Sequence, residues 1–158
     1  MPLSVSPSAV IVVEQPAGSS LSSDTSTVSF GSSNIGTEVQ KTFVIKNTGA
    51  STLHLEPTPI SLDGDNTADF FFDPPPLLTL APGTSTTFTA SFYPLATGPR
   101  EAHIHIGSDS VTGSPFNIRL TGTGFSGSPH IGVDQPSGSA IANNASVDFS
   151  GGIVGGGV

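Results

Sequence analysis

The stretch Gly36–Gly49, with the sequence GTEVQKTFVIKNTG, decides the fold expected of this 158-residue chain. Val39, Phe43 and Ile45 occupy alternate positions in it, so they share one face of an extended strand. Mostly polar residues take the other face, and Asn47–Gly49 then supplies residues that are typical of a turn. This two-residue period predicts a β-strand with one buried side and one wet side.

The same alternation recurs at regular spacing, and no segment of useful length has a helical period. The clearest cases are residues 87–93, 102–106 and 116–121. A further run at 53–62 is interrupted by two prolines, which is typical of an edge strand. Such spacing predicts an all-β, antiparallel sandwich of about seven to nine strands. Its predicted core consists of Val28, Phe30, Val39, Phe43, Ile45, Phe88, Phe92, Ile104, Ile106, Phe116, Ile118 and Leu120.

The composition argues against several classes of partner. Twelve acidic residues against four basic ones give a net charge of −8. Nucleic acid requires clustered basic side chains that neutralise phosphates, and an anionic membrane surface requires them too. No segment has the length and hydropathy of a membrane span. The chain contains no cysteine, so neither disulfides nor thiolate metal sites can form. We expect no nucleic-acid partner, no membrane insertion and no cofactor.

An internal repeat divides the chain. The sequence Ile11–Leu21 recurs as Ile131–Ile141, with six of eleven positions identical. A joint rich in glycine and proline lies between the two copies. Repetition of this kind is typical of arrays built from similar units. The expected parts are an N-terminal extension at 1–10, a complete unit at 11–124, a linker at 125–130 and the opening strands of a second, incomplete unit at 131–158.

The expected incomplete unit would leave apolar side chains and strand edges without partners. The first unit already contains its own copy of these strands. The predicted destination is therefore an edge of a neighbouring copy, reached by adding or exchanging strands. A tandem protein cut within a repeat is the alternative. The residues expected to make the contact are Ile131, Val133, Val147, Phe149, Ile153 and Val154.

One predicted strand carries two histidines and a glutamate on a single face. Glu101, His103 and His105 alternate with apolar residues there. Two histidines two positions apart can share a zinc ion when further ligands come from elsewhere. The ends of the triplet lie ~13 Å apart at the rise of a strand, so all three cannot bind one ion. We expect an exposed polar face and no tightly held metal.

An oxygen-rich turn and an aromatic run complete the candidate sites. Asp63, Asp65 and Asp69 lie in a segment with the composition of a calcium loop. The segment lacks the spacing and closing glutamate of an EF-hand, and such residues also form ordinary turns. The run Phe70–Phe72 is interpreted as a plug at one end of the sandwich, with a sugar platform as the alternative. No catalytic constellation accompanies these residues, so we expect a protein that is not an enzyme.

Three motifs carry a resemblance to a known family. They are VSFGSSNIGTEVQKTFVIKNTG from Val28, LAPGTSTTFTASFYPLATG from Leu80 and PFNIRLTGTG from Pro115. These motifs resemble the bacterial choice-of-anchor D repeat, which is related to the immunoglobulin-like domains of abnormal-spindle and hydin proteins. The resemblance implies an immunoglobulin-like sandwich, often in tandem, in large secreted or surface-anchored proteins. It supplies no functional residues.

The resemblance and the repeat together suggest a structural role. We expect a repeat of an extracellular or cell-surface fibre, filament, stalk or adhesin, whose partners are other copies of itself. One alternative is an extracellular module that binds carbohydrate or protein. The other is an intracellular scaffold domain of the abnormal-spindle and hydin type.

Overall fold

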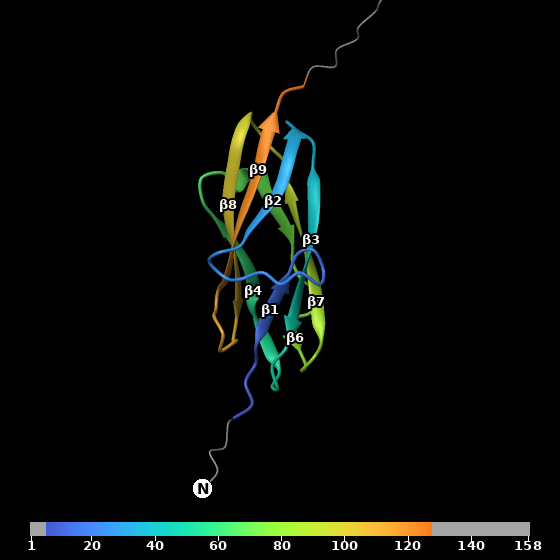
Figure 1. The fold of residues 1–158 in the computed structure, drawn as a ribbon, viewed down its shortest axis with the longest axis vertical. Helices are drawn as coiled ribbons and strands as arrows, with labels where there is room; N and C mark the ends of the chain where they lie inside the picture. The colour runs from blue at the N-terminus through green and yellow to red at the C-terminus, as the bar shows by residue number, and fades with distance from the viewer. Residues whose placement is uncertain (1–5, 128–158) are drawn as a thin grey trace, which may run out of the picture. The chain divides into compact units, whose positions relative to one another are not determined.

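Two β-sheets make up the part of the chain that the computed structural model describes, residues 6–127 (Figure 1). Within this part, nine strands and one short 3-10 turn follow one another along the chain. The strands are β1 Ile11–Glu14, β2 Thr27–Asn34, β3 Val39–Asn47, β4 Leu53–Asp63, β5 Phe70–Asp73, β6 Thr79–Leu80, β7 Ser85–Phe92, β8 Gly98–Ser108 and β9 Phe116–Phe125, and the turn η1 is Thr67–Asp69.

The alternating segments pair as a sandwich. One sheet has the strand order β1-β3-β7-β5 and the other the order β2-β9-β8-β4-β6. The predicted stretch Gly36–Gly49 supplies β3, which lies between β1 and β7. Neighbouring strands of the described residues are antiparallel except β2 and β9, which run parallel. The predicted all-β sandwich is confirmed, and its strand count falls within the predicted range.

The core follows the predicted inward faces. Phe43 is fully buried and stacks on its cross-strand partner Phe88, with ring centroids 4.8 Å apart. All the predicted core residues are buried except Val39, which is partly buried against the others. The structure adds apolar residues from β1, β4, β5 and β6, which are short or interrupted strands with weaker alternation, together with three alanines on or beside the predicted strands. These are Ala9, Ile11, Val13, Leu53, Leu55, Ile60, Phe70, Leu80, Ala90 and Ala102.

The proline-interrupted run forms β4, and the prediction of an edge strand holds only in part, because β6 covers just Leu53 and His54 of it. β4 pairs with β8 on one side and with the two-residue strand β6 on the other. Its pairing with β8 shifts register between Leu55 and Ile60, the interval that contains Pro57 and Pro59. A proline cannot donate to a ladder, and both prolines lie where the pairing with β8 shifts register and beyond the two residues that pair with β6.

The aromatic run forms β5, and alternate rings of it turn inward, as the interpretation as a plug supposed. β5 is the outer strand of the first sheet and pairs with β7. Its alternation buries Phe70 and half-buries Phe72, whereas Phe71 faces outward and is 52% exposed. A single exposed ring is a poor platform for a sugar. The strand register therefore accounts for the run, with Phe70 in the core beside Phe30 and Phe92.

The chain enters and leaves the sandwich at opposite ends (Figure 1). We call the end where β1 begins the entry end; there the loops at 48–52, 81–84 and 109–115 meet β1 and β3. We call the end where β9 finishes the exit end; there the loops at 35–38 and 93–97 meet β9. Residues 6–127 include no helix with the length and hydropathy to cross a membrane.

The segment predicted to assemble with another copy lies outside the described residues. This applies to the whole incomplete unit at 131–158 and to Ile131, Val133, Val147, Phe149, Ile153 and Val154 within it. Those predictions remain predictions.

Candidate functional site

Polar side chains gather on the outer face of the five-stranded sheet. Ala102, Ile104 and Ile106 of β8 turn into the core, so the residues between them face outward. The register then places His103 between Asp63 of β4 and Arg119 of β9, and His105 between Ser61 and Asn117. The predicted polar face is thus extended across three strands.

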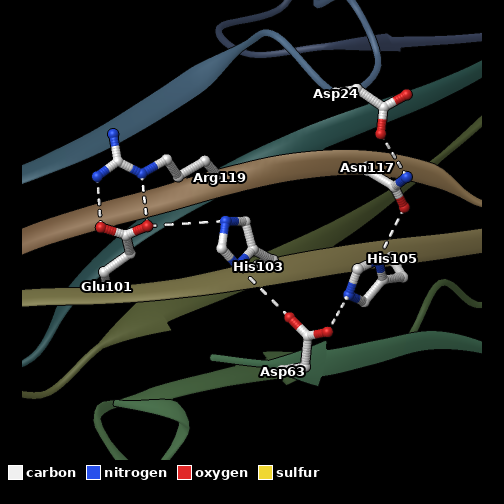
Figure 2. Close-up of polar contacts among 7 residues, drawn as sticks. All are labelled: Asp24, Asp63, Glu101, His103, His105, Asn117 and Arg119. Atoms are coloured by element: carbon white, nitrogen blue, oxygen red, sulfur yellow. Dashed lines mark hydrogen bonds and ion pairs between the residues drawn. The ribbon is translucent and has the colours of Figure 1, made fainter. Parts of the chain in front are cut away.

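A chain of polar contacts crosses this face from β4 to the loop before β2 (Figure 2). The Asp63 carboxylate lies between the two imidazoles, 3.4 Å from Nδ1 of His103 and 3.1 Å from Nε2 of His105. Nδ1 of His105 donates to Oδ1 of Asn117 at 2.7 Å, because an amide oxygen can only accept. Nδ2 of Asn117 in turn donates to Oδ1 of Asp24 at 2.6 Å. The network fastens three strands and one loop.

A second group lies beside it. Arg119 binds the Glu101 carboxylate through two nitrogens, and its Nε lies 2.6 Å from Oε1. The bond from Arg119 holds the pKa of Glu101 below its usual value. Nε2 of His103 lies 3.7 Å from the same carboxylate, so His103 stands between two acidic groups. Because both members of the Glu101–Arg119 pair are substantially exposed, the pair contributes little to stability.

His105 is the titratable centre of the network. Its hydrogen bond to Asn117 raises its pKa, and the carboxylates of Asp63 and Asp24 act in the same direction, while partial burial opposes them. Nε2 of His105 is buried and lies at ion-pair distance from Asp63 without a hydrogen-bond partner. The charged imidazolium therefore fits this position better than the neutral ring does.

The candidate metal ligands are only partly brought together. Asp63 joins the two histidines, a pairing that the sequence did not predict. Asp69 belongs elsewhere, because it is buried at the exit end beside Arg100. Across residues 6–127, no three histidine or carboxylate side chains are arranged to hold a metal ion. The expectation that no metal is tightly held stays a prediction.

Two shallow hollows flank the network. One of about 530 Å³ is lined mostly by serine, threonine and charged residues, among them Asp65 and Arg119. The other, of about 450 Å³, surrounds His103 and His105. Neither lining includes a phenylalanine, tyrosine or tryptophan ring. The face can exchange a proton at His105 and present polar groups, and the aromatic rings in the two linings are the imidazoles of His103 and His105.

A buried amide at the entry end was recognised from the sequence only as part of a turn. The side chain of Asn47 is 1% exposed. Its Nδ2 donates to the carbonyl oxygens of Ser51 at 2.8 Å and Leu80 at 2.9 Å. Its Oδ1 accepts from the backbone N–H of Gly49 at 2.9 Å. A sequence Asn-Thr-Gly indicates a turn, but it does not show that the amide is enclosed by a third segment.

A buried ion pair at the exit end was also missed. Oδ2 of Asp69 lies 3.2 Å from Nε of Arg100, and both side chains are largely buried. The carbonyl oxygen of Asp69 accepts from the N–H of Tyr93 at 2.8 Å, and its Oδ1 accepts from the N–H of Leu95 at 3.3 Å. The only signal in the sequence was the scarcity of basic residues, which makes each one a candidate for a structural role.

Comparison with known proteins identifies the fold. The model of a family described as Cep192 domain 4 matches residues 18–125. A Porphyromonas gingivalis W83 protein of unknown function has a TM-score of 0.57 at 16% identity, over 77% of this chain and 50% of that one. The ASH/PapD-like domain 7 of human CEP192 has a TM-score of 0.50 at 14% identity, over 81% of this chain and 94% of that one.

More distant matches are partial. The Vibrio cholerae VesB protease gives a TM-score of 0.48 at 15% identity, over 62% of this chain and 30% of that one. The chain thus spans half or less of the first two structures that it matches. No curated protein matches it in sequence. At these identities the structural similarities establish an immunoglobulin-like, PapD-like sandwich and nothing about activity.

Proposed function

Because the chain belongs to the Cep192 domain 4 family, whose match covers most of an immunoglobulin-like sandwich, we propose that it is a non-enzymatic structural repeat of an extracellular fibre, filament, stalk or adhesin. The observation that carries this proposal is the recurrence of Ile11–Leu21 as Ile131–Ile141. In the first copy this sequence supplies β1, an outer strand of the first sheet. A second copy of an outer strand is suited to pairing with another molecule.

The path of the chain through the described unit supports an extended array. β1 begins at the entry end and β9 finishes at the exit end, so the unit is threaded from one end to the other (Figure 1). Units threaded in this way lengthen an array when they follow one another. Contacts made head to tail do not close on themselves and generate filaments.

The surface location rests on the resemblance and on composition. The motifs similar to the choice-of-anchor D repeat fall on β2 and β3, on the segment from β6 to the loop after β7, and on β9. The acidic, lysine-poor composition supports the same location. Antibody labelling of intact source cells tests this part of the proposal. Labelling only after permeabilisation would favour an intracellular scaffold instead.

The scaffold is the second candidate because a specific observation favours it. The family matched is named for a Cep192 domain, and a similar solved structure is an ASH/PapD-like domain. The other alternative, a carbohydrate- or protein-binding module, would use the polar hollow of about 530 Å³ on the outer sheet face. A glycan array probed with the purified chain separates it from a purely structural role.

The proposed assembly is tested by measuring the mass of the particles that the purified chain forms in solution. Sedimentation velocity should show concentration-dependent association for the full chain and a monomer for a chain that ends at Gly127. A full-length chain carrying Val147→Ser and Phe149→Ser is the matched control, because it keeps the length and changes only apolar positions. We expect this control to behave like the shortened chain. Monomers in every case would contradict assembly through residues 131–158.

A further inference from the structure

Four of the eight large apolar side chains that are exposed in the described unit belong to segments at its exit end. We propose that the exit patch, defined as Ile35, Tyr93, Leu95 and Phe125, is the surface that contacts the entry end of a second copy. The side chains are 41%, 37%, 54% and 42% exposed, respectively. This inference rests on the proposed self-assembly and names the surface that it uses.

Backbone hydrogen bonds join the segments that carry the four side chains. The N–H of Ile35 donates to the carbonyl oxygen of Phe125 at 2.9 Å. The N–H of the next residue, Gly36, donates to the carbonyl oxygen of Pro94 at 3.0 Å. Gly36 has φ +77°, and a Cβ there would lie 3.4 Å from the Tyr93 hydroxyl. The turn between β2 and β3 is therefore tied both to β9 and to the loop at 93–97.

The loop that presents two of these side chains is fixed from inside. Asp69 accepts from the N–H of Leu95, and its own carbonyl accepts from the N–H of Tyr93. Arg100, its ion-pair partner, donates from Nε to the carbonyl oxygen of Ala96 at 3.2 Å and from a terminal nitrogen to that of Thr97 at 2.9 Å. Burying an ion pair is costly, and here it orders a loop whose side chains face solvent. A preformed loop loses little entropy when it is covered.

Charge and chain path indicate what covers the patch. The chain carries a net charge of −8, so copies repel one another except where uncharged surface meets, and none of the four patch side chains is charged. The sequence of β1 resumes at Ile131, six residues after Phe125 (131 − 125), and six residues span at most about 20 Å. Any strand that this chain lends to a second copy therefore draws that copy to the exit end.

The entry end offers an apolar counterpart. Val111, in the loop between β8 and β9, is 68% exposed. Its N–H donates to the carbonyl oxygen of Ala9 at 3.2 Å, which places it beside the start of β1. A contact between Val111 of one copy and Leu95 of the next joins different surfaces of the two molecules, as an open array requires. The patch is small for a stable interface, so it acts together with strand exchange, which keeps the partner close.

The full chain provides the test. Leu95→Ser and Phe125→Ser, made separately, should each weaken association at least about tenfold in sedimentation velocity, because each removes buried apolar area from the contact. Phe71→Ser is the matched control, since Phe71 is 52% exposed but lies on the outer face of β5. It should change association less than about twofold. Circular dichroism melting checks that each variant is folded.

Val111→Ser tests the direction of the contact. It should weaken association about as much as Leu95→Ser, and the double variant should be less than additive if the two side chains meet. An effect of Leu95→Ser without one of Val111→Ser would overturn the entry-end partner. A wild-type chain that associates but is insensitive to Leu95→Ser and Phe125→Ser would overturn the patch and leave the proposed function standing. A wild-type chain that stays monomeric would contradict both the exit patch and the proposed self-assembly.

Discussion

The entry end and the exit end each depend on one buried polar side chain, but of different kinds. Asn47 at the entry end is neutral, and its amide binds backbone groups of Val10, of the loop at 48–52 and of Leu80. Asp69 at the exit end is charged and needs Arg100 from β8 beside it. Its Oδ2 has no hydrogen-bond partner, only this ion pair. The Asn47 amide joins the loop at 48–52 to β6 through backbone groups alone, whereas the Asp69 carboxylate also requires a charged side chain from β8.

The difference matches what the two loops display. The turn fixed by Asn47 is mostly polar at the surface, while the loop fixed by Asp69 carries Tyr93 and Leu95 into solvent. A loop with exposed apolar side chains would otherwise tend to fold them inward. The ion pair between η1 and β8 resists that rearrangement, because separating it leaves a buried charge unpaired.

The largest loss of stability is expected from a substitution in the core between the two ends. Phe43→Ala should lower the free energy of unfolding by about 3–5 kcal/mol, because it removes a fully buried ring stacked on Phe88. Urea denaturation measures this. Thr42→Ala, at the exposed neighbour, is the control and should cost far less. An unchanged melting temperature for Phe43→Ala would show that Phe43 does not lie in the core.

Asn47→Ala should come next, with a loss of about 2–4 kcal/mol. The carbonyl oxygens of Ser51 and Leu80 and the N–H of Gly49 would lose a partner in a buried setting. Asn34→Ala is the comparison at the exit end, since Asn34 is exposed and accepts one bond, from the N–H of Gly127. Equal losses for the two asparagines would show that the entry-end amide has no special role.

Asp69→Asn should cost less, about 1–3 kcal/mol. The amide oxygen can still accept from the N–H of Leu95, and Arg100 keeps the carbonyl oxygens of Ala96 and Thr97 as acceptors. The converse change, Asn47→Asp, should be more damaging, because the entry end contains no basic side chain bound to that position. Urea denaturation of both variants measures the two losses in the free energy of unfolding and shows which is larger. The reverse order would mean that the two ends do not differ as described.

The smallest effect should be a pH dependence from the sheet face between the ends. The folded-state pKa of His105 is raised above 6.5, so its contribution is fully present below that pH and is lost as the pH rises through the folded pKa. Stability measured from about pH 6 to 8 should therefore fall more in the wild type than in His105→Gln. Asn117→Ala should flatten the profile in the same way, because it removes the main cause. Parallel profiles for all three proteins would refute this assignment.

Alternation along the sequence predicted which way each side chain faces, and for β3, β7, β8 and β9 the structure agrees. It could not predict which strands are neighbours. Asp63 meets His103 and His105 only because β4 pairs with β8 in one particular register. The parallel pairing of β2 with β9 and the position of β4 between β8 and β6 also depend on how strands far apart in the sequence pair with one another. Periodicity contains no information about register between distant segments.

The pair Asp69–Arg100 was missed for a related reason. Asp69 stands next to three phenylalanines in the sequence, and its position in an acidic segment suggested a solvated turn. The fold turns it inward because Phe70, the next residue, must pair with Phe92 in the core. Burial of Phe70 therefore also buries Asp69, and Arg100 of β8 supplies the opposite charge beside it.

The opposite positions of the chain's entry and exit also determine how the unit would carry a pulling force. Tension between the ends would act along β1 and β9, so their cross-strand hydrogen bonds, which lie across the strands, would be loaded in shear. β9 spans ten residues and is bonded to a strand on each side, whereas β1 spans four and pairs with β3 alone among the strands described. Single-molecule stretching should therefore detach β1 before the main rupture, and a single rupture of the whole unit would contradict this. In a fibre under load, β1 would act as the element that yields first while the remaining sandwich stays intact.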